Sequence, residues 1–190
     1  MKRFMCLFLA AALLLATMVT AFAAGSMTPS ATSKTRSGGS SSDSGWTRPA
    51  APAAEVVVTE ASKAVNDQIA EMSAAVASGL SPLSTLASEI QAQLAELGNN
   101  VTVNEACAIK VKNYKQGDID TEFSFATRYE EGMTLLSLIT CFDANNEIMN
   151  QFVLPATVTA DGKVVIHFTE AVLKAMSEAA SSSNCIFEQV

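Results

Sequence analysis

Residues 159–180 constrain the fold most, because they carry three structural signals in succession. Asp161-Gly162 predicts a tight turn, since glycine accepts the positive φ that a two-residue hairpin needs. Residues 163–168 are β-branched and aromatic, which predicts a strand. Thr169 offers a side-chain oxygen to cap a helix, and apolar residues then recur at helical spacing: Val172, Leu173, Met176 and Ala180. We therefore expect a hairpin, a strand and a helix that folds back onto a sheet.

Residues 1–24 are predicted to be an export signal. Lys2 and Arg3 give it a positive start, the following stretch is almost wholly apolar, and Ala21-Phe22-Ala23 supplies the small residues that a signal peptidase reads. We expect cleavage after Ala23 or Ala24 and a secreted or cell-surface protein. The alternative is an uncleaved anchor, because the apolar stretch is long enough to span a bilayer.

Residues 25–54 consist mainly of Ser, Gly, Thr, Pro and Ala. Such a segment has too little apolar surface to offset its ordering entropy, so it predicts a disordered linker. Trp46, the only tryptophan, lies in this segment. It is either a solvated aromatic residue or a docking residue for a partner.

Residues 55–100 predict a helical hairpin. Val65, Ile69, Met72 and Val76 form one face of a first helix. Ser81-Pro82 begins a second helix and Gly98 ends it. Its apolar stripe consists of Leu83, Leu86, Ile90, Leu94 and Leu97. We expect the stripe to pack on the domain that follows. Self-association through Leu83, Leu86, Ile90 and Leu94 is the alternative.

Residues 101–190 predict the main domain. Period-two alternation indicates a strand around residues 107–111 and another around 123–129. The apolar run 133–142 indicates a central strand that is covered on both faces. Residues 148–154 predict a further strand with Phe152 and Leu154 inward, and 185–190 a last one. The predicted fold class is α+β: an N-terminal helical hairpin, then a mostly antiparallel meander of five to six strands with one helix before the last strand.

The net charge of −7 becomes more negative once the signal is removed, because the signal has two basic residues and no acidic one. This balance argues against binding to nucleic acid or, after cleavage, to an anionic membrane. Three cysteines lie outside the signal: Cys107, Cys141 and Cys185. Their odd number and the absence of a C-x-x-C motif leave two possible states: one disulfide with one free thiol, or three buried thiols.

Two acidic stretches look like calcium loops. Each lacks the glycine at the sixth position and the glutamate at the twelfth; they begin at Asp118-x-Asp120-x-Glu122 and Asp143-x-Asn145-x-Glu147. We interpret both as solvated turns. The sequence also contains no phosphate loop, dinucleotide fingerprint or G-x-S-x-G motif. We predict no catalytic, cofactor-binding or metal-binding residues.

His167 is the only histidine. Strand alternation places it with Lys163 and Val165 on the less apolar face. It could act as a general base only if a cysteine or a carboxylate lies beside it in space. Spacing alone excludes none of the three cysteines as its partner.

The run from Asp161 to Thr169, leading into its helix, resembles the ending of small exported domains of unknown function from anaerobic Gram-positive bacteria. The resemblance covers residues 101–190 and implies secretion or surface display. It assigns no catalytic residue.

The sequence thus favours an exported, non-enzymatic binding or assembly module at or outside the cell envelope, with a protein partner or self-association through the helical hairpin. The alternative is a small secreted hydrolase or thiol enzyme that uses His167 with a cysteine or a carboxylate.

Overall fold

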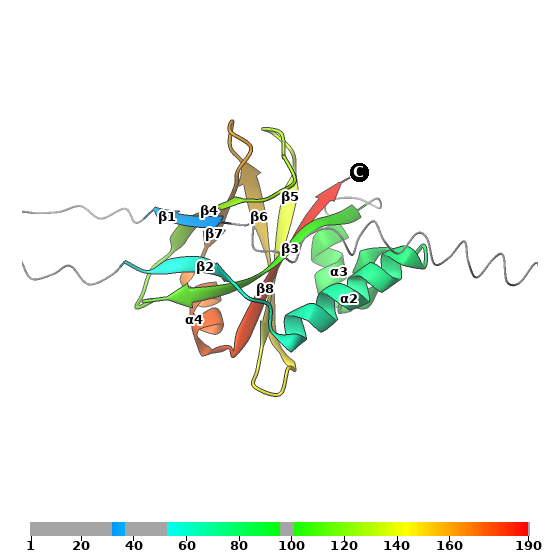
Figure 1. Ribbon diagram of the computed structural model, residues 1–190, viewed down its shortest axis with the longest axis horizontal. Helices are drawn as coiled ribbons and strands as arrows, with labels where there is room; N and C mark the ends of the chain where they lie inside the picture. Colours follow the sequence, from blue (N-terminus) through cyan, green and yellow to red (C-terminus); the bar gives the residue numbers. More distant parts are fainter. Residues whose placement is uncertain (1–31, 37–52, 96–100, 190) are drawn as a thin grey trace, which may run out of the picture.

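The computed structural model describes residues 32–36, 53–95 and 101–189 (Figure 1). The strands are β1 (Thr32–Arg36), β2 (Glu55–Thr59), β3 (Val101–Lys112), β4 (Ile119–Ser124), β5 (Leu135–Phe142), β6 (Ile148–Val158), β7 (Val164–Phe168) and β8 (Ser181–Gln189). The helices are α2 (Lys63–Ala77), the 3₁₀ turn η1 (Pro82–Thr85), α3 (Ser88–Leu94) and α4 (Glu170–Glu178). The predicted signal, Trp46, Leu97 and Gly98 lie outside the described residues. No helix among the described residues is long and apolar enough to cross a membrane.

All eight strands belong to one antiparallel sheet in the order β1-β4-β7-β6-β5-β8-β3-β2. The sheet is nearly closed into a barrel, because its two edge strands, β1 and β2, lie next to each other. The predicted fold class, a helical hairpin followed by a meander of five to six strands, is therefore wrong. Two strands precede the expected sheet, β8 inserts between β5 and β3, and β3 does not pair with β4.

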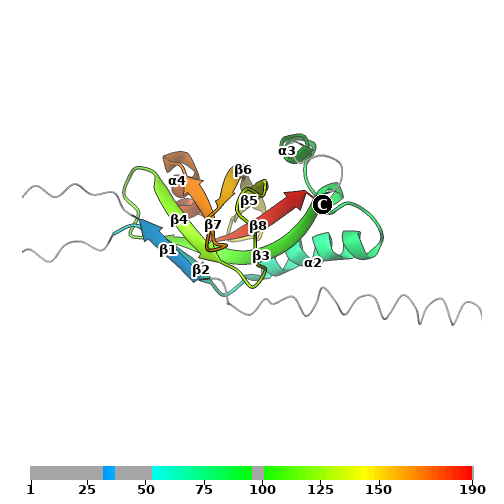
Figure 2. The ribbon, with the colours of Figure 1, turned by 90° about the horizontal axis from the view of Figure 1, so that it is seen from above.

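The central strand β5 explains how the two sides of the sheet are covered. All eight of its residues are buried, as the apolar run predicted. Leu135, Ile139 and Cys141 belong to an inner cluster with side chains of α4. Leu136 and Leu138 belong to an outer cluster with residues of α2 and α3. The helices thus cover opposite sides of the strands (Figure 2).

Helix α4 fills the barrel interior at the end of β7. Its spacing of apolar residues produces one buried face, made of Val172, Leu173, Ala175 and Met176. Thr169 stands at the expected N-cap position, but its side chain accepts no cap hydrogen bond. Instead, the backbone N–H of Glu170 donates to Oδ1 of Asp118 at 2.7 Å. The cap therefore comes from the segment that enters β4, not from the helix itself.

The predicted second helix is broken. Only η1 and the short α3 form, with Leu86 and Ala87 extended between them. The hydroxyls of Ser84 and Thr85 donate to the carbonyl oxygens of Ser81 and Pro82, which competes with helical pairing at this point. The break still lets Leu86, Ile90 and Leu94 pack in the outer cluster. The chain's own sheet therefore covers the stripe that was considered for self-association.

A buried polar network joins α2 to the outer side of the sheet. Gln68 donates to Thr140 Oγ1 at 2.9 Å and accepts from Ser183 Oγ at 2.6 Å. Ser137 Oγ likewise donates to Asn184 Oδ1 at 2.8 Å, whereas Asn184 Nδ2 has no partner among the described residues. Partners from distant segments, which local sequence does not reveal, thus allow the polar residues at the start of β8 to lie buried in the sheet.

Candidate ligand pocket at the barrel mouth

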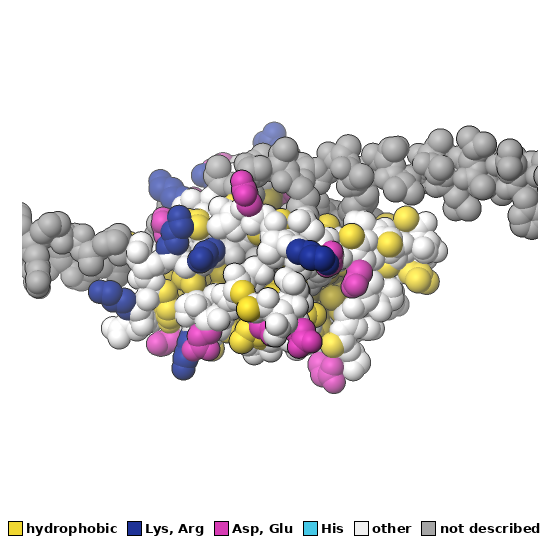
Figure 3. All heavy atoms as spheres, turned by 60° about the horizontal axis from the view of Figure 1, so that its bottom comes forward, with side chains coloured by type: hydrophobic (Ala, Val, Ile, Leu, Met, Phe, Trp, Pro, Cys, Tyr) yellow, Lys and Arg dark blue, Asp and Glu magenta, His cyan; other side chains and the backbone are white. Residues whose placement is uncertain are grey.

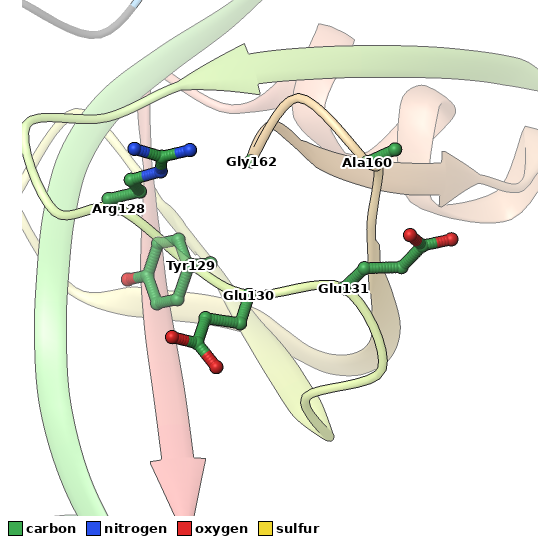
Figure 4. Close-up of a pocket in the computed structure, with 6 residues that line it drawn as sticks. All are labelled: Arg128, Tyr129, Glu130, Glu131, Ala160 and Gly162. Atoms are coloured by element: carbon green, nitrogen blue, oxygen red, sulfur yellow. The ribbon is translucent and has the colours of Figure 1, made fainter.

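A pocket of about 350 Å³ lies at the barrel mouth, the end of β7 that is opposite α4 (Figure 4). Two connections form it. The segment 125–134 between β4 and β5 contributes Arg128, Tyr129, Glu130 and Glu131, and the β6–β7 turn contributes Ala160 and Gly162. Its size is at the lower end of the range of small-molecule sites.

The β6–β7 turn is held by its own hydrogen bonds. The N–H of Gly162 donates to the carbonyl of Thr159 at 2.8 Å, and the N–H of Thr159 donates to that of Lys163 at 2.9 Å. Gly162 has a φ of +79°, and a Cβ built on it would lie 3.2 Å from the carbonyl oxygen of Tyr129. The predicted Asp161-Gly162 turn is confirmed. Its glycine also permits the close approach of the two connections that form the pocket.

Tyr129 anchors the other wall of the pocket. Its side chain is 2% exposed and packs edge-on against Phe125, with ring centroids 6.3 Å apart. Figure 4 shows its hydroxyl pointing away from Ala160 and Gly162. Just before it, the N–H of Thr127 donates to Glu105 Oε1 at 2.8 Å. Strand β4 ends at Ser124, so the predicted strand around 123–129 becomes an anchored loop instead.

Buried polar groups lie behind this wall. A register shift between Val103 and Glu105 interrupts the β3–β8 ladder, and Asn104 donates to Glu188 on β8. Burial raises the pKa of Tyr129, and the nearby carboxylates of Glu105 and Glu188 raise it further. The Tyr129 hydroxyl has no hydrogen-bond partner among the described residues. This tyrosine therefore stays neutral and serves as a wall, not as an acid or base.

The charges of the pocket are separated along its length. In Figure 4 the guanidinium of Arg128 lies toward Gly162, whereas the carboxylate of Glu131 extends toward Ala160. The side chain of Glu130 turns away from the hairpin. The pocket thus offers a cationic donor on one side and an anionic acceptor on the other. The sequence places Arg128 and Tyr129 in the predicted strand around 123–129, and nothing local pairs segment 128–131 with 160–162.

His167 lies elsewhere, on the exposed side of β7, as alternation predicted. Its Nδ1 is 2.7 Å from Asp120 Oδ1, and its Nε2 is 3.4 Å from Asp118 Oδ2. The hydrogen bond with Asp120 and the negative charges of Asp120 and Asp118 raise the pKa of His167. A histidine that acts as a general base needs one ring nitrogen facing its substrate or nucleophile. Here both nitrogens face carboxylates, and His167 does not line the mouth pocket.

The three cysteines are free and buried, which resolves the choice left by their number. Burial raises the pKa of Cys185 to about 12 and also raises the pKa values of Cys107 and Cys141. Because the thiolate is the nucleophile, these thiols are inert. None of them pairs with the exposed His167, and the thiol-enzyme arrangement does not form.

The two acidic stretches hold the chain in turns and caps. Asp118 caps α4 and Asp120 pairs with His167. Asp143 accepts from the N–H groups of Asn145 and Glu147, which lowers its pKa. Within the described ranges, no group of three or more His, Cys, Asp or Glu side chains is arranged to hold a metal ion.

The face of the molecule that Figure 3 shows carries charges of both signs. Basic side chains gather toward its left end and acidic ones toward its lower edge, with hydrophobic ones between them.

Comparison with known proteins does not assign this arrangement. No family model matches the chain, and neither a curated protein nor a solved structure matches it.

Proposed function

We propose that the protein is an exported, non-enzymatic binding module whose mouth pocket binds a small dipolar molecule, such as a free amino acid or a short peptide. The separation of Arg128 and Glu131 across a pocket of about 350 Å³ carries the proposal. A carboxylate of the ligand would accept hydrogen bonds from the planar guanidinium, which suits that geometry. An ammonium group would donate to Glu131.

Two further features support binding without chemistry. The pocket is placed between two connections that are fixed by a buried tyrosine on one side and a hydrogen-bonded turn on the other. A fixed pocket loses less conformational entropy when a ligand binds. His167 and the cysteines, which the sequence offered as a base and nucleophiles, are engaged elsewhere or buried.

Isothermal titration calorimetry with the full chain tests the pocket. A panel of amino acids and dipeptides is compared with the same compounds blocked by N-acetylation or C-amidation. We expect Arg128→Gln to lower the affinity for unblocked ligands by about tenfold or more, the value of one charge-assisted hydrogen bond. Glu131→Gln should do the same. Arg128→Gln should bind a free ligand and its C-amidated form equally, and Glu131→Gln should bind a free ligand and its N-acetylated form equally.

Glu130→Gln is the matched control: Glu130 is among the residues that line the pocket, but its carboxylate turns away from the hairpin and from the space between Arg128 and Glu131. It removes the same charge from the same segment and should leave affinity unchanged. Equal losses of affinity in Glu130→Gln and Glu131→Gln would show that the net charge of the segment, and not a contact with Glu131, causes the effect. Absence of binding by every unblocked member of the panel would refute the proposed ligand class.

Export is proposed on the basis of residues 1–24 and is tested separately. The full chain is expressed in a Gram-positive host, and its mass is measured in the medium and in the cell fraction. We expect an exported product that begins at Ala24 or Gly25. A full-length product that stays with the membrane would instead favour the anchor.

A further inference from the structure

Strand β1 differs from every other described strand because it contains no apolar residue. Like the other edge strand, β2, it pairs with one strand only, in this case with β4, from Thr32 opposite Ser124 to Arg36 opposite Asp120. Its sequence, Thr-Ser-Lys-Thr-Arg, contains no apolar residue. Ser33 is only half-buried and Lys34 is exposed. The strand therefore adds no apolar side chain to the hydrophobic core and is held by its ladder with β4.

Strand β4, by contrast, is fixed whether or not β1 is present. Its other edge pairs with β7, and Ile119, Thr121 and Phe123 are buried. Without β1, the outer edge of β4 would present unpaired backbone groups to solvent, which is a template for another strand. Figure 1 shows β1 and β2 at this edge of the sheet.

Charge favours β1 as the strand that covers this edge. Lys34 lies opposite Glu122 in the register, and Arg36 lies opposite Asp120. Asp118 follows on the same acidic stretch. Opposite charges facing each other across an antiparallel pair stabilise it. A basic strand therefore suits this edge better than an acidic one from the rest of this acidic chain.

The connection between β1 and the rest of the domain is long. Residues 37–52, which include Ser37-Gly38-Gly39-Ser40-Ser41-Ser42, join β1 to the described chain that resumes at residue 53. Sixteen residues reach at most ~55 Å when extended. The same connection can therefore place β1 on its own β4 or on the β4 of a neighbouring copy.

We propose that β1 is an exchangeable strand, and that copies of this chain associate when β1 of one copy pairs with β4 of another. The exchanged pair has the same contacts as the pair within one chain, so exchange loses no interaction. Its extent depends on the protein concentration relative to the effective concentration of the tethered strand, about millimolar for such linkers. Chains crowded on a surface would associate, and dilute chains would not.

Disulfide trapping with full chains tests the exchange. Lys34→Cys in one chain and Glu122→Cys in another place two thiols opposite each other only if β1 crosses between copies. Opposite residues of an antiparallel pair lie within the Cα distances that a disulfide accepts. The native cysteines are buried and should not interfere. Under mild oxidation at about millimolar protein, we expect several-fold more covalent heterodimer from this mixture than from the control.

The control mixture combines Glu122→Cys with Ala92→Cys, an exposed position on α3, and measures random collision. A chain with both Lys34→Cys and Glu122→Cys should form an intrachain disulfide in dilute solution. That result shows that β1 pairs with β4 at all. Heterodimer no more abundant than in the control would overturn exchange between copies. A double variant that does not cross-link would overturn the pairing itself, and neither result bears on the mouth pocket.

Discussion

At one end of the barrel-like sheet, α4 fills the interior with the aliphatic side chains of its buried face, whereas at the other end a loop inserts the ring of Tyr129. The α4 end is regular, capped and surrounded by exposed charges. The mouth has no helix, and its wall depends on one aromatic anchor and one glycine turn. A closed end contributes stability, and an end built from connections leaves room for a ligand.

Replacing the anchor should have the largest effect. Tyr129→Ala removes a ring that is 2% exposed, and such truncations cost about 3–5 kcal/mol of unfolding free energy. Chemical denaturation measures the loss. Tyr129→Phe is the control: the hydroxyl has no partner among the described residues, so removing it should leave stability unchanged or slightly raised. A strongly destabilised Tyr129→Phe would show that the hydroxyl has a partner.

Truncation at the opposite end should come next. Leu173 is fully buried in the inner cluster, and Leu173→Ala should cost about 2–5 kcal/mol. If the two ends form one cooperative unit, both variants should shift a single unfolding transition without changing its slope in denaturant. A separate early transition in Tyr129→Ala alone would mean that the mouth opens independently of the barrel.

The cap of α4 should give a smaller effect. Asp118→Ala removes the acceptor for the Glu170 N–H, a change that costs about 1 kcal/mol for helix caps. Asp118→Asn keeps an acceptor oxygen and should retain most of that stability. Thermal or chemical unfolding of the two variants distinguishes the cap from the charge. An equal loss in both would assign the effect to the carboxylate charge, not to the cap.

The sequence predicted individual elements better than their arrangement. Residues 133–142 revealed a strand buried on both faces, and alternation placed His167 outside, because both depend on local pattern. Thr32–Arg36 gave no signal, since the strand itself contains no apolar side chain. The helical spacing of apolar residues in 83–97 did not predict the break in the helix. The break involves hydrogen bonds from the hydroxyls of Ser84 and Thr85 to backbone carbonyls, and apolar spacing contains no information about them.

The mouth pocket could not be predicted for a related reason. Asp161-Gly162 was recognised as a turn. That this turn meets segment 128–131 depends on Tyr129 entering the core and on β7 lying between β4 and β6. The sheet order follows from these long-range contacts. A single sequence contains the residues of such a site but not their proximity.

The smallest expected effect concerns His167 and depends on pH. Its pKa is raised in the folded protein by Asp120 and Asp118, so protonation favours folding. The resulting stability is fully present below the unfolded pKa of about 6.5. It is lost as pH rises through the higher folded pKa. The difference in unfolding free energy between the native chain and His167→Gln should therefore be largest near pH 5–6 and should shrink above about pH 7.

Unfolding of the native chain and of His167→Gln, measured at several pH values, tests this pH dependence. Asp120→Asn provides the matched change in the partner of His167. It should remove most of the pH dependence while retaining His167, because the Asp120 contact is the shorter one. Added salt should weaken the effect as well, since the pair is exposed and screened. A difference that instead grew with pH would mean that folding favours the neutral imidazole. His167 would then have a free nitrogen, and the comparison between a purely structural α4 end and a ligand-binding mouth would no longer hold.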